Sequence, residues 1–267
     1  MAHESILACL QGRTVYDLGV ELYPGMPHHP FHAPFTFQLM REHGDLVFGG
    51  GVSSAVELFG MTGHTGTHLD GLGHFAKNLC LHGGISATDV QSKTAGIRAH
   101  GIETVPPILR RGVLLDVAAA QGVAHLGASQ TIGPDDLEAA ARYAGVEVRS
   151  GDVLLVRTGW LAFWPDQRRY YSIQSGVPGL SLDGARWATE RGVYCIGSDN
   201  CGVEYLPAPE NAYPVHVHCL TERGVHLMEV VNLEPLSQAR VYEFLLLVVP
   251  MKIRGGTASP VRPLAVI

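Results

Sequence analysis

Short runs of apolar and β-branched residues recur along the chain, and each run is bounded by Gly, Pro or charged residues. Runs of this length and composition predict buried strands. We expect strands over residues 14–20, 55–61, 112–117, 152–158, 193–198, 225–230 and 241–250. The longest apolar run is far shorter than the ~20 residues needed to span a bilayer, so no membrane partner is expected.

Two segments carry helix signals instead. Pro134 precedes two acidic residues and a run of Ala, which favours a helix start, and Gly145 should end that helix. Residues 182–191 predict a second helix, closed by Gly192. Residues 23–30 are too rich in Pro for a regular element, residues 35–46 are ambiguous, and Gly255-Gly256 should begin a C-terminal loop.

Strands that alternate with helices predict a mixed α/β fold. The chain has 267 residues and shows no internal repeat, low-complexity tract or linker. We therefore expect one domain over residues 1–267.

Composition narrows the function classes. The net charge of −6 is spread along the chain, without the basic run of a nucleic-acid binder, so no nucleic-acid partner is expected. The five cysteines are odd in number and lack Cys-x-x-Cys spacing, which argues against a disulfide framework or a thiolate zinc site. The N-terminus, with His3 and Glu4, lacks signal-peptide features, so a cytoplasmic location is expected.

Residues that can bind a metal or transfer a proton are most concentrated in residues 64–74, which contain three imidazoles and one carboxylate among several glycines. If the middle of this segment is extended, His68 and Asp70 point to the same face. A bend at Gly66 would bring His64 to the same point. The resulting nitrogen and oxygen ligand set suits zinc or manganese and leaves room for water and substrate.

A second cluster of His and Glu occupies residues 216–229. Glu229 stands in an apolar, strand-like run, where a buried acid is costly unless it is paired or bound to a cation. It could be a distant ligand, with His218 or His216 beside it. The remaining histidines are interpreted as structural or surface residues: His3, His28, His29, His32, His43, His82, His100 and His125.

At these residues the sequence resembles the cyclase family of metal-dependent hydrolases, which includes bacterial kynurenine formamidases and isatin hydrolases. The family pattern His-x-Gly-Thr-His-x-Asp-x-x-x-His is matched from His64 to His74. The likeness extends over nearly the whole chain. It includes residues 23–27, 112–116, 156–160, 197–199 and 255–262.

The resemblance implies a mixed α/β domain with a barrel-like sheet and flanking helices, assembled into dimers or larger oligomers such as tetramers. It implies that His64, His68 and Asp70 bind a divalent metal, manganese or zinc, and that His74 is the acid/base. A His and a Glu from the later cluster, His218 (or His216) and Glu229, would complete the site. Where the family commonly has Ala-Pro after the Asp, this chain has Gly71-Leu72, which alters the pocket wall.

The expected activity is hydrolysis of an amide or cyclic amide in a small, aromatic substrate similar to isatin or N-formylkynurenine. A divalent metal lowers the pKa of water to about 7, and His74 would carry a proton to the leaving nitrogen. Glu229 would hold the metal or orient the water, and Phe48 and Trp160 are candidate substrate contacts. The alternatives are hydrolysis of an ester, carbamate or lactone, a biosynthetic cyclase, and a metal-binding protein without catalysis.

Overall fold

The computed structural model describes residue 8 and residues 11–172 and 174–267. His3 and Glu4, on which the signal-peptide expectation rests, and Cys9 lie outside the described residues. None of the helices in the described part combines the length and the apolar character that a membrane span requires.

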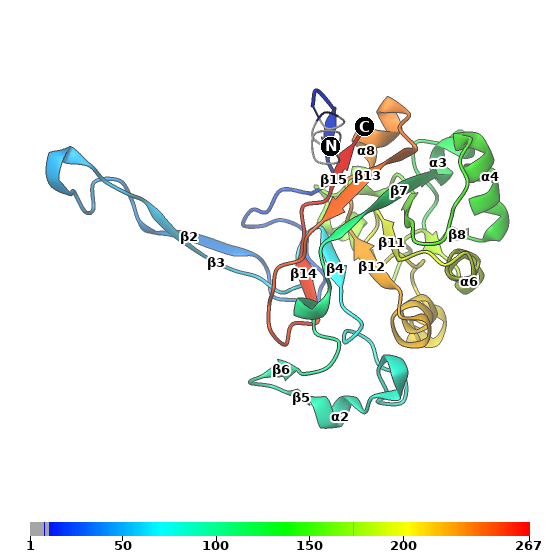
Figure 1. The fold of residues 1–267 in the computed structure, drawn as a ribbon, viewed down its shortest axis with the longest axis horizontal. Helices are drawn as coiled ribbons and strands as arrows, with labels where there is room; N and C mark the ends of the chain where they lie inside the picture. The colour runs from blue at the N-terminus through cyan, green and yellow to red at the C-terminus, as the bar shows by residue number, and fades with distance from the viewer. Residues whose placement is uncertain (1–7, 9–10, 173) are drawn as a thin grey trace.

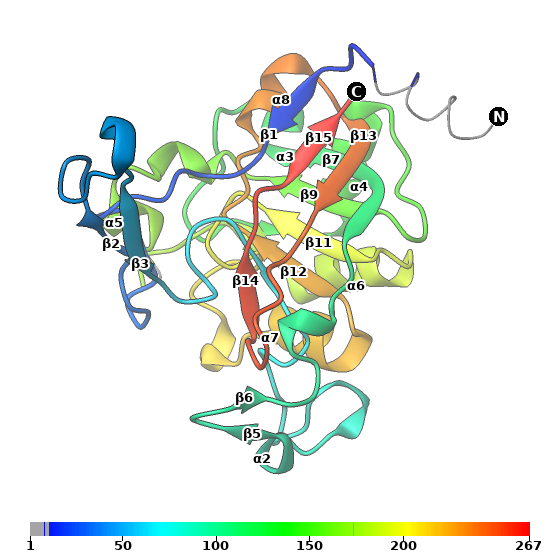
Figure 2. The same cartoon turned by 60° about the vertical axis from the view of Figure 1, so that its left-hand side comes forward.

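A curled, nine-stranded mixed sheet forms the body of the molecule (Figures 1 and 2). The architecture confirms the expected mixed α/β fold with a barrel-like sheet. Across the sheet the strands are β1 (Val15–Asp17), β15 (Leu264–Val266), β13 (Glu243–Val248), β7 (Ile108–Asp116), β9 (Val153–Arg157), β11 (Cys195–Ser198), β12 (His226–Glu229), β4 (His68–Asp70) and β14 (Ala258–Pro260).

The four central strands, from β7 to β12, are parallel, and both of their faces are buried over the residues that pair in parallel. On β7, Val113 and Leu115 belong to one hydrophobic core while Leu114, between them, belongs to another. Side chains alternate between the faces of a strand, and a strand buried on both faces is therefore apolar throughout. This explains why runs 112–117 and 152–158 could be recognised from the sequence.

Helices cover the face that contains Val113. Three of them are α3 (Val117–Ala120), α4 (Pro134–Ala144) and α6 (Leu182–Glu190). As expected, α4 ends at Gly145, which takes the left-handed conformation with φ 67°. The other helices are α2 (Ala87–Val90), α5 (Gln167–Tyr170), α7 (Pro214–His216), which runs into a π-helical segment (Val217–Arg223), and α8 (Glu234–Ala239), on the opposite core.

Three two-stranded sheets lie outside the main sheet. They pair β2 (Thr36–Arg41) with β3 (Val56–Gly60), β5 (Gln91–Ser92) with β6 (Gly96–Ile97), and β8 (Thr131–Ile132) with β10 (Gly179–Leu180). The β2–β3 hairpin projects far from the body (Figure 1). The ambiguous segment 35–46 thus contains a strand. The expected C-terminal loop at Gly255 is a turn that is followed by β14 and β15, two strands that the sequence did not predict.

Candidate metal centre

Strand register brings the two distant clusters together. β4 lies antiparallel to β12, and His68 is paired with Glu229 in that register. His68 Nε2 lies 3.4 Å from Glu229 Oε2 and 3.7 Å from Asp70 Oδ1. His68 and Asp70 therefore share one face of an extended segment, as the alternation in the sequence predicts.

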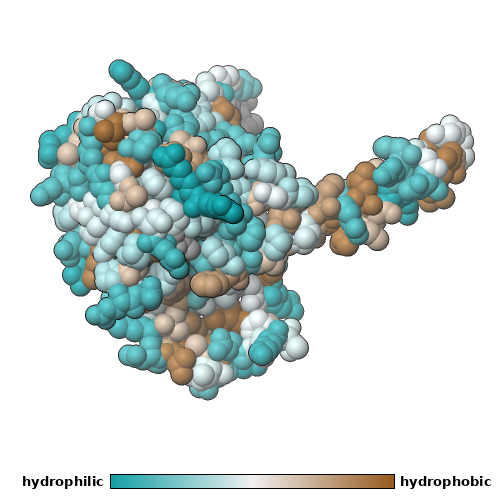
Figure 3. Space-filling view, turned by 180° about the vertical axis from the view of Figure 1, so that it is seen from behind, coloured by the Kyte–Doolittle hydropathy of each residue, from teal (hydrophilic) through white to brown (hydrophobic). Residues whose placement is uncertain are grey.

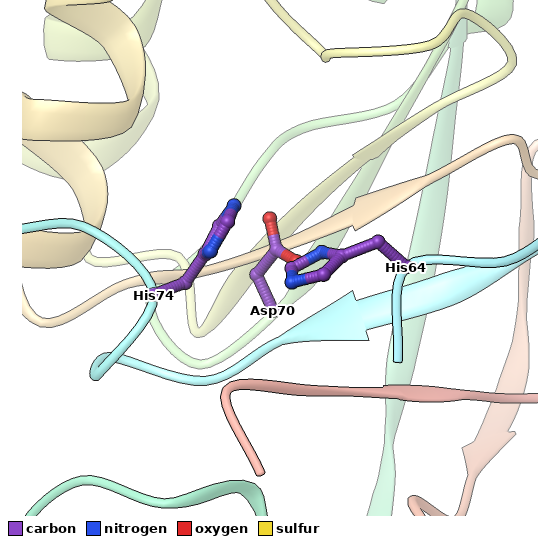
Figure 4. Close-up of side chains that lie close together, drawn as sticks. All are labelled: His64, Asp70 and His74. Atoms are coloured by element: carbon purple, nitrogen blue, oxygen red, sulfur yellow. The ribbon is translucent and has the colours of Figure 1, made fainter. Parts of the chain in front are cut away.

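His64 reaches the same point because the chain bends after it. Gly66 has φ 61°, in the left-handed region that favours glycine. The bend leaves His64 Nδ1 2.9 Å from Asp70 Oδ1. Figure 4 shows His64 and His74 on either side of the Asp70 carboxylate. The rings of His64 and His74 have centroids 4.0 Å apart.

Two groups of side chains have the composition and spacing to hold a cation. One is His64, Asp70 and His74, and the other is His68, Asp70 and Glu229; in each, the ligand atoms lie within 4.8 Å of one another. Asp70 belongs to both. Both of its carboxylate oxygens are buried; Oδ2 has no hydrogen-bond partner, and the close neighbour of Oδ1 is the His64 ring nitrogen Nδ1, at 2.9 Å. A buried carboxylate with so few donors is expensive unless a cation neutralises it, so these residues fit a divalent metal.

Neighbouring groups orient the candidate ligands. The backbone carbonyl of Gly66 lies 2.8 Å from His68 Nδ1, which directs Nε2 toward the two carboxylates. Likewise, His226 Nδ1 lies 2.8 Å from the Asp70 carbonyl oxygen. The first contact limits rotation of the His68 ring, and the second fixes the backbone at Asp70, so both hold ligand atoms in place.

The surroundings shift the pKa values of His68 and His74 in opposite directions. Burial lowers the pKa of His68, but the carboxylates of Glu229 and Asp70 outweigh it and raise the pKa to about 9. Burial dominates at His74 and lowers its pKa to about 3 despite the nearby Asp70 carboxylate. His74 is therefore neutral at pH 7, with a lone pair that can accept a proton or bind a metal.

Of the two downstream histidines, the structure brings His216 and not His218 to this cluster. His216 Nε2 lies 3.2 Å from Glu229 Oε1, and its Nδ1 lies 2.8 Å from Glu204 Oε2. His218 Nε2 lies 2.9 Å from Thr189 Oγ1, and its Nδ1 contacts Glu222. The expectation for His218 is therefore corrected: its ring nitrogens are engaged outside the pocket.

The members of the cluster other than Asp70 line a cavity of about 240 Å³. Imidazoles and aromatic rings dominate its walls, and no Lys or Arg is among the lining residues that the structure describes. The lining residues are His29, His32, His64, His68, His74, Phe75, Tyr171, Cys201, Gly202, Leu206, Tyr213, His216 and Glu229.

The two expected substrate contacts do not line this cavity. Phe48 is half-exposed near the tip of the β2–β3 hairpin, away from the body. Trp160 is buried, and its Nε1 donates to the carbonyl oxygen of Tyr170. Trp160 belongs to the same apolar cluster as Tyr171, so it packs behind the pocket wall.

Sequence reasoning missed His29 and His32 as pocket residues. His29 lies within the proline-rich segment and His32 follows it, and the ring centroids of His32 and His64 are 5.3 Å apart. His32 Nδ1 is buried without a hydrogen-bond partner. The sequence signal that could have found them is a pair of histidines in and beside a loop rich in proline. Binding residues often lie on loops that the rest of the fold positions.

Comparison with known proteins gives the family. The sequence matches the Cyclase family over residues 16–205. This chain belongs to the Cyclase family. A crystal structure described as a novel cyclase is similar over 99% of this chain and 90% of its own, with 27% identity and a TM-score of 0.88. No similar protein was found among the curated proteins.

Two isatin hydrolases share the fold of this Cyclase family member. Isatin hydrolase A from Ralstonia solanacearum has 23% identity and a TM-score of 0.75, covering 100% of this chain and 96% of its own. An isatin hydrolase bound to the product analogue thioisatinate has 19% identity and a TM-score of 0.76, covering 100% and 97% respectively.

Proposed function

We propose that this protein is a metal-dependent hydrolase that opens an amide or cyclic amide bond in a small aromatic substrate, of the isatin or N-formylkynurenine type. The observation that carries the proposal is Asp70, a buried carboxylate with an unpartnered oxygen that is shared by two groups able to hold a metal, whose other members line a pocket. The fold shared with isatin hydrolases supports this substrate class.

The pocket walls suit such a substrate. Phe75, Tyr171 and Tyr213 offer ring surfaces, and the absence of Lys and Arg from the described lining favours a neutral or weakly anionic molecule. The cavity volume of about 240 Å³ favours a small one.

His64, His68, Asp70 and Glu229 would hold zinc or manganese. When bound, a divalent cation supplies a Lewis acid that lowers the pKa of water to about 7 and polarises a carbonyl oxygen. His74 would accept a proton from the attacking water and return it to the leaving nitrogen; its imidazole is neutral at pH 7, and the nearby Asp70 carboxylate favours the protonated form that this transfer requires.

Glu229 receives support from a second layer of residues. Burial raises its pKa, but His216 and His68 outweigh this effect and hold it well below the usual range for Glu, so the carboxylate is ionised. His216 is itself fixed by Glu204, which also accepts from the His216 backbone N–H at 3.1 Å. Glu229 is thereby available as an anionic ligand or as an acceptor that orients water.

The test combines metal analysis of the purified protein with assays on isatin and N-formylkynurenine, before and after chelation. Stoichiometric zinc or manganese with chelator-sensitive ring opening or deformylation is the expected result. Metal without either activity would redirect the search to esters, carbamates, lactones or ring closure. Purified protein without metal, and with no gain of activity on adding zinc or manganese, would refute the proposal.

Two variants separate the assigned roles. Asp70→Ala should remove both metal and activity, because both ligand groups lose their shared carboxylate. His74→Ala should retain metal while its turnover falls by about 10²–10⁴-fold, the usual contribution of a general acid or base. Equal loss of metal in both variants would show that His74 is a ligand instead.

A further inference from the structure

The wall of the cavity carries a series of ring contacts that leads from the metal centre to Tyr171. Ring centroids lie 5.3 Å apart for His64 and His32, 4.8 Å for His32 and His29, and 6.1 Å for His29 and Tyr171. All four residues line the cavity. Two rings thus separate Tyr171 from His64, so Tyr171 faces a part of a bound molecule other than the group that meets the metal.

The hydroxyl group of Tyr171 has no protein partner. Tyr171 is only 8% exposed, yet its hydroxyl forms no hydrogen bond with any residue that the structure describes. The oxygen is not enclosed by protein atoms either, so it opens into the cavity that the ring lines. The adjacent Tyr170 differs, because its hydroxyl donates to the carbonyl oxygen of Asp199 at 2.9 Å. A buried donor is costly while it is unpaired, so the Tyr171 hydroxyl is suited to a ligand.

The Tyr171 hydroxyl is a donor with a fixed direction. Burial, with smaller contributions from the Cys201 thiol and the Glu229 carboxylate, raises the pKa of Tyr171 well above its ordinary value, so the phenol is protonated at neutral pH. Cys201 and Glu229 both line the cavity, which agrees with a hydroxyl directed inward. The ring is held edge-to-face by His29, at 87°, and by Tyr170, at 82°. A donor held in this way loses little freedom when a ligand binds.

The residues around Tyr171 favour a neutral acceptor. A carboxylate would approach the ionised Glu229, and no Lys or Arg among the described lining residues would offset the repulsion. A neutral carbonyl oxygen accepts from a phenol without this cost. The face of the body shown in Figure 3 is largely hydrophilic, whereas the cavity offers the rings of Phe75 and Tyr213. The cavity therefore suits an aromatic compound with a carbonyl oxygen directed at Tyr171.

We propose that the Tyr171 hydroxyl donates a hydrogen bond to a neutral carbonyl oxygen of the substrate that is separate from the carbonyl under attack. The cavity then selects aromatic amides that carry a second carbonyl group. This inference rests on the proposed hydrolase function and adds a substrate requirement to it. The bond is made both before and during the reaction, so Tyr171 acts on substrate binding rather than on the chemical step. Loss of the hydroxyl should raise KM and leave kcat within a few-fold of wild type.

The test compares two matched pairs of probes on the purified, metal-loaded protein. Isatin and oxindole share a cyclic amide, and 2-formamidoacetophenone and formanilide share an open one; only the first member of each pair has the second carbonyl. Calorimetric titration gives the affinity for each probe, and kinetics gives KM and kcat wherever turnover occurs. In at least one pair the wild type should prefer the dicarbonyl member by about tenfold or more, the usual penalty for an unpaired buried donor.

Tyr171→Phe removes only the hydroxyl and should reduce the preference to within about threefold, with metal content unchanged. Tyr170→Phe is the matched control: it should lower Tm, because the bond to Asp199 is lost, and keep the preference. A wild type without the preference, or a Tyr171→Phe variant that keeps it or loses affinity equally for both members of a pair, would overturn the proposal. Preferential binding without hydrolysis of any probe would uphold the role of the hydroxyl and count against the proposed function alone.

Discussion

His216 and His218 are two residues apart, yet only His216 faces the pocket. In a strand such residues would share a face, but in a helix they lie roughly 200° apart around the axis. Both belong to the α7 and π-helical segment, which the sequence did not predict. The sequence could not decide which of the two histidines faces the pocket, because that depends on how this unpredicted helix is oriented about its axis.

The two histidines should respond differently to substitution. His216→Gln should lower kcat by about 10²-fold, because Glu229 loses the imidazole that holds it. His218→Gln is the matched control and should stay within a few-fold of wild type, with a stability cost of about 1 kcal/mol for the contact with Thr189. Steady-state kinetics and urea denaturation measure both effects, and equal losses of activity would contradict the assignment of His216.

Asp199 illustrates a buried acid that serves structure. It accepts hydrogen bonds from Thr158 N–H and Oγ1–H and from Gly159 N–H. Burial nevertheless outweighs these donors and raises its pKa from 3.8 to about 6. The folded state thus holds this proton more tightly than the unfolded state does, so its contribution to stability is complete below pH 4 and is lost as the pH rises through 6.

Asp199→Asn should reveal this pH dependence. The variant cannot titrate, so its free energy of unfolding relative to wild type should change by up to about 3 kcal/mol between pH 4 and pH 7, with the larger deficit at pH 4. Urea denaturation across this range measures it. A deficit independent of pH would show that Asp199 is ionised throughout.

At the level of elements, the sequence predicted the parallel strands of the sheet. It also predicted that the chain bends at Gly66 and is extended from His68 to Asp70. Central strands are recognisable because both of their faces are apolar. The neighbours of β4 could not be predicted, since β12 and β14 come from much later in the chain and meet β4 through tertiary pairing. β3 lies within the strand expected over residues 55–61, but its pairing with β2 in an exposed hairpin was not predicted, because its apolar residues match a buried strand as well as an exposed ribbon.

Gly63 shows how closely the chain before β4 approaches β14. A Cβ at this position would lie 2.6 Å from the carbonyl oxygen of Ala258 in β14, a backbone atom that cannot turn aside. Gly63→Ala should therefore lower the free energy of unfolding by about 1–3 kcal/mol and weaken metal binding through displacement of His64. Urea denaturation and metal analysis test this. Gly127→Ala, whose added Cβ would meet only Gln130 at an ordinary 3.6 Å, should be tolerated.

At the scale of the whole molecule, the barrel-like sheet was expected from the family resemblance alone, because no periodicity in the sequence encodes strand order. β1 pairs with β15, so residues near the two ends of the described chain lie side by side (Figure 2). β14 packs on β4, whose residues enter the metal centre. The integrity of the site therefore depends on the C-terminal strands as well as on the motif.

Metal binding should stabilise the folded state of the whole chain. A cation that binds only the folded state at a hundred times its Kd contributes about 2.7 kcal/mol, which corresponds to a rise in Tm of roughly 5–10 °C for a chain of this size. Thermal denaturation with zinc or manganese, against a chelated sample, measures the shift. Asp70→Ala should show none, and a full shift in that variant would place the metal elsewhere.

Because Asp70 belongs to both ligand groups, its carboxylate affects how many metal ions the protein can bind and how tightly. Its single negative charge serves both ligand groups, so two cations could not fill them independently. The group that contains Glu229 has a second carboxylate and should fill first, and a cation at the other group would then meet its repulsion in a buried setting where charges are poorly screened. Titration of the metal-free protein should then resolve one tight and one weak step, which would leave the second position the easier of the two to exchange.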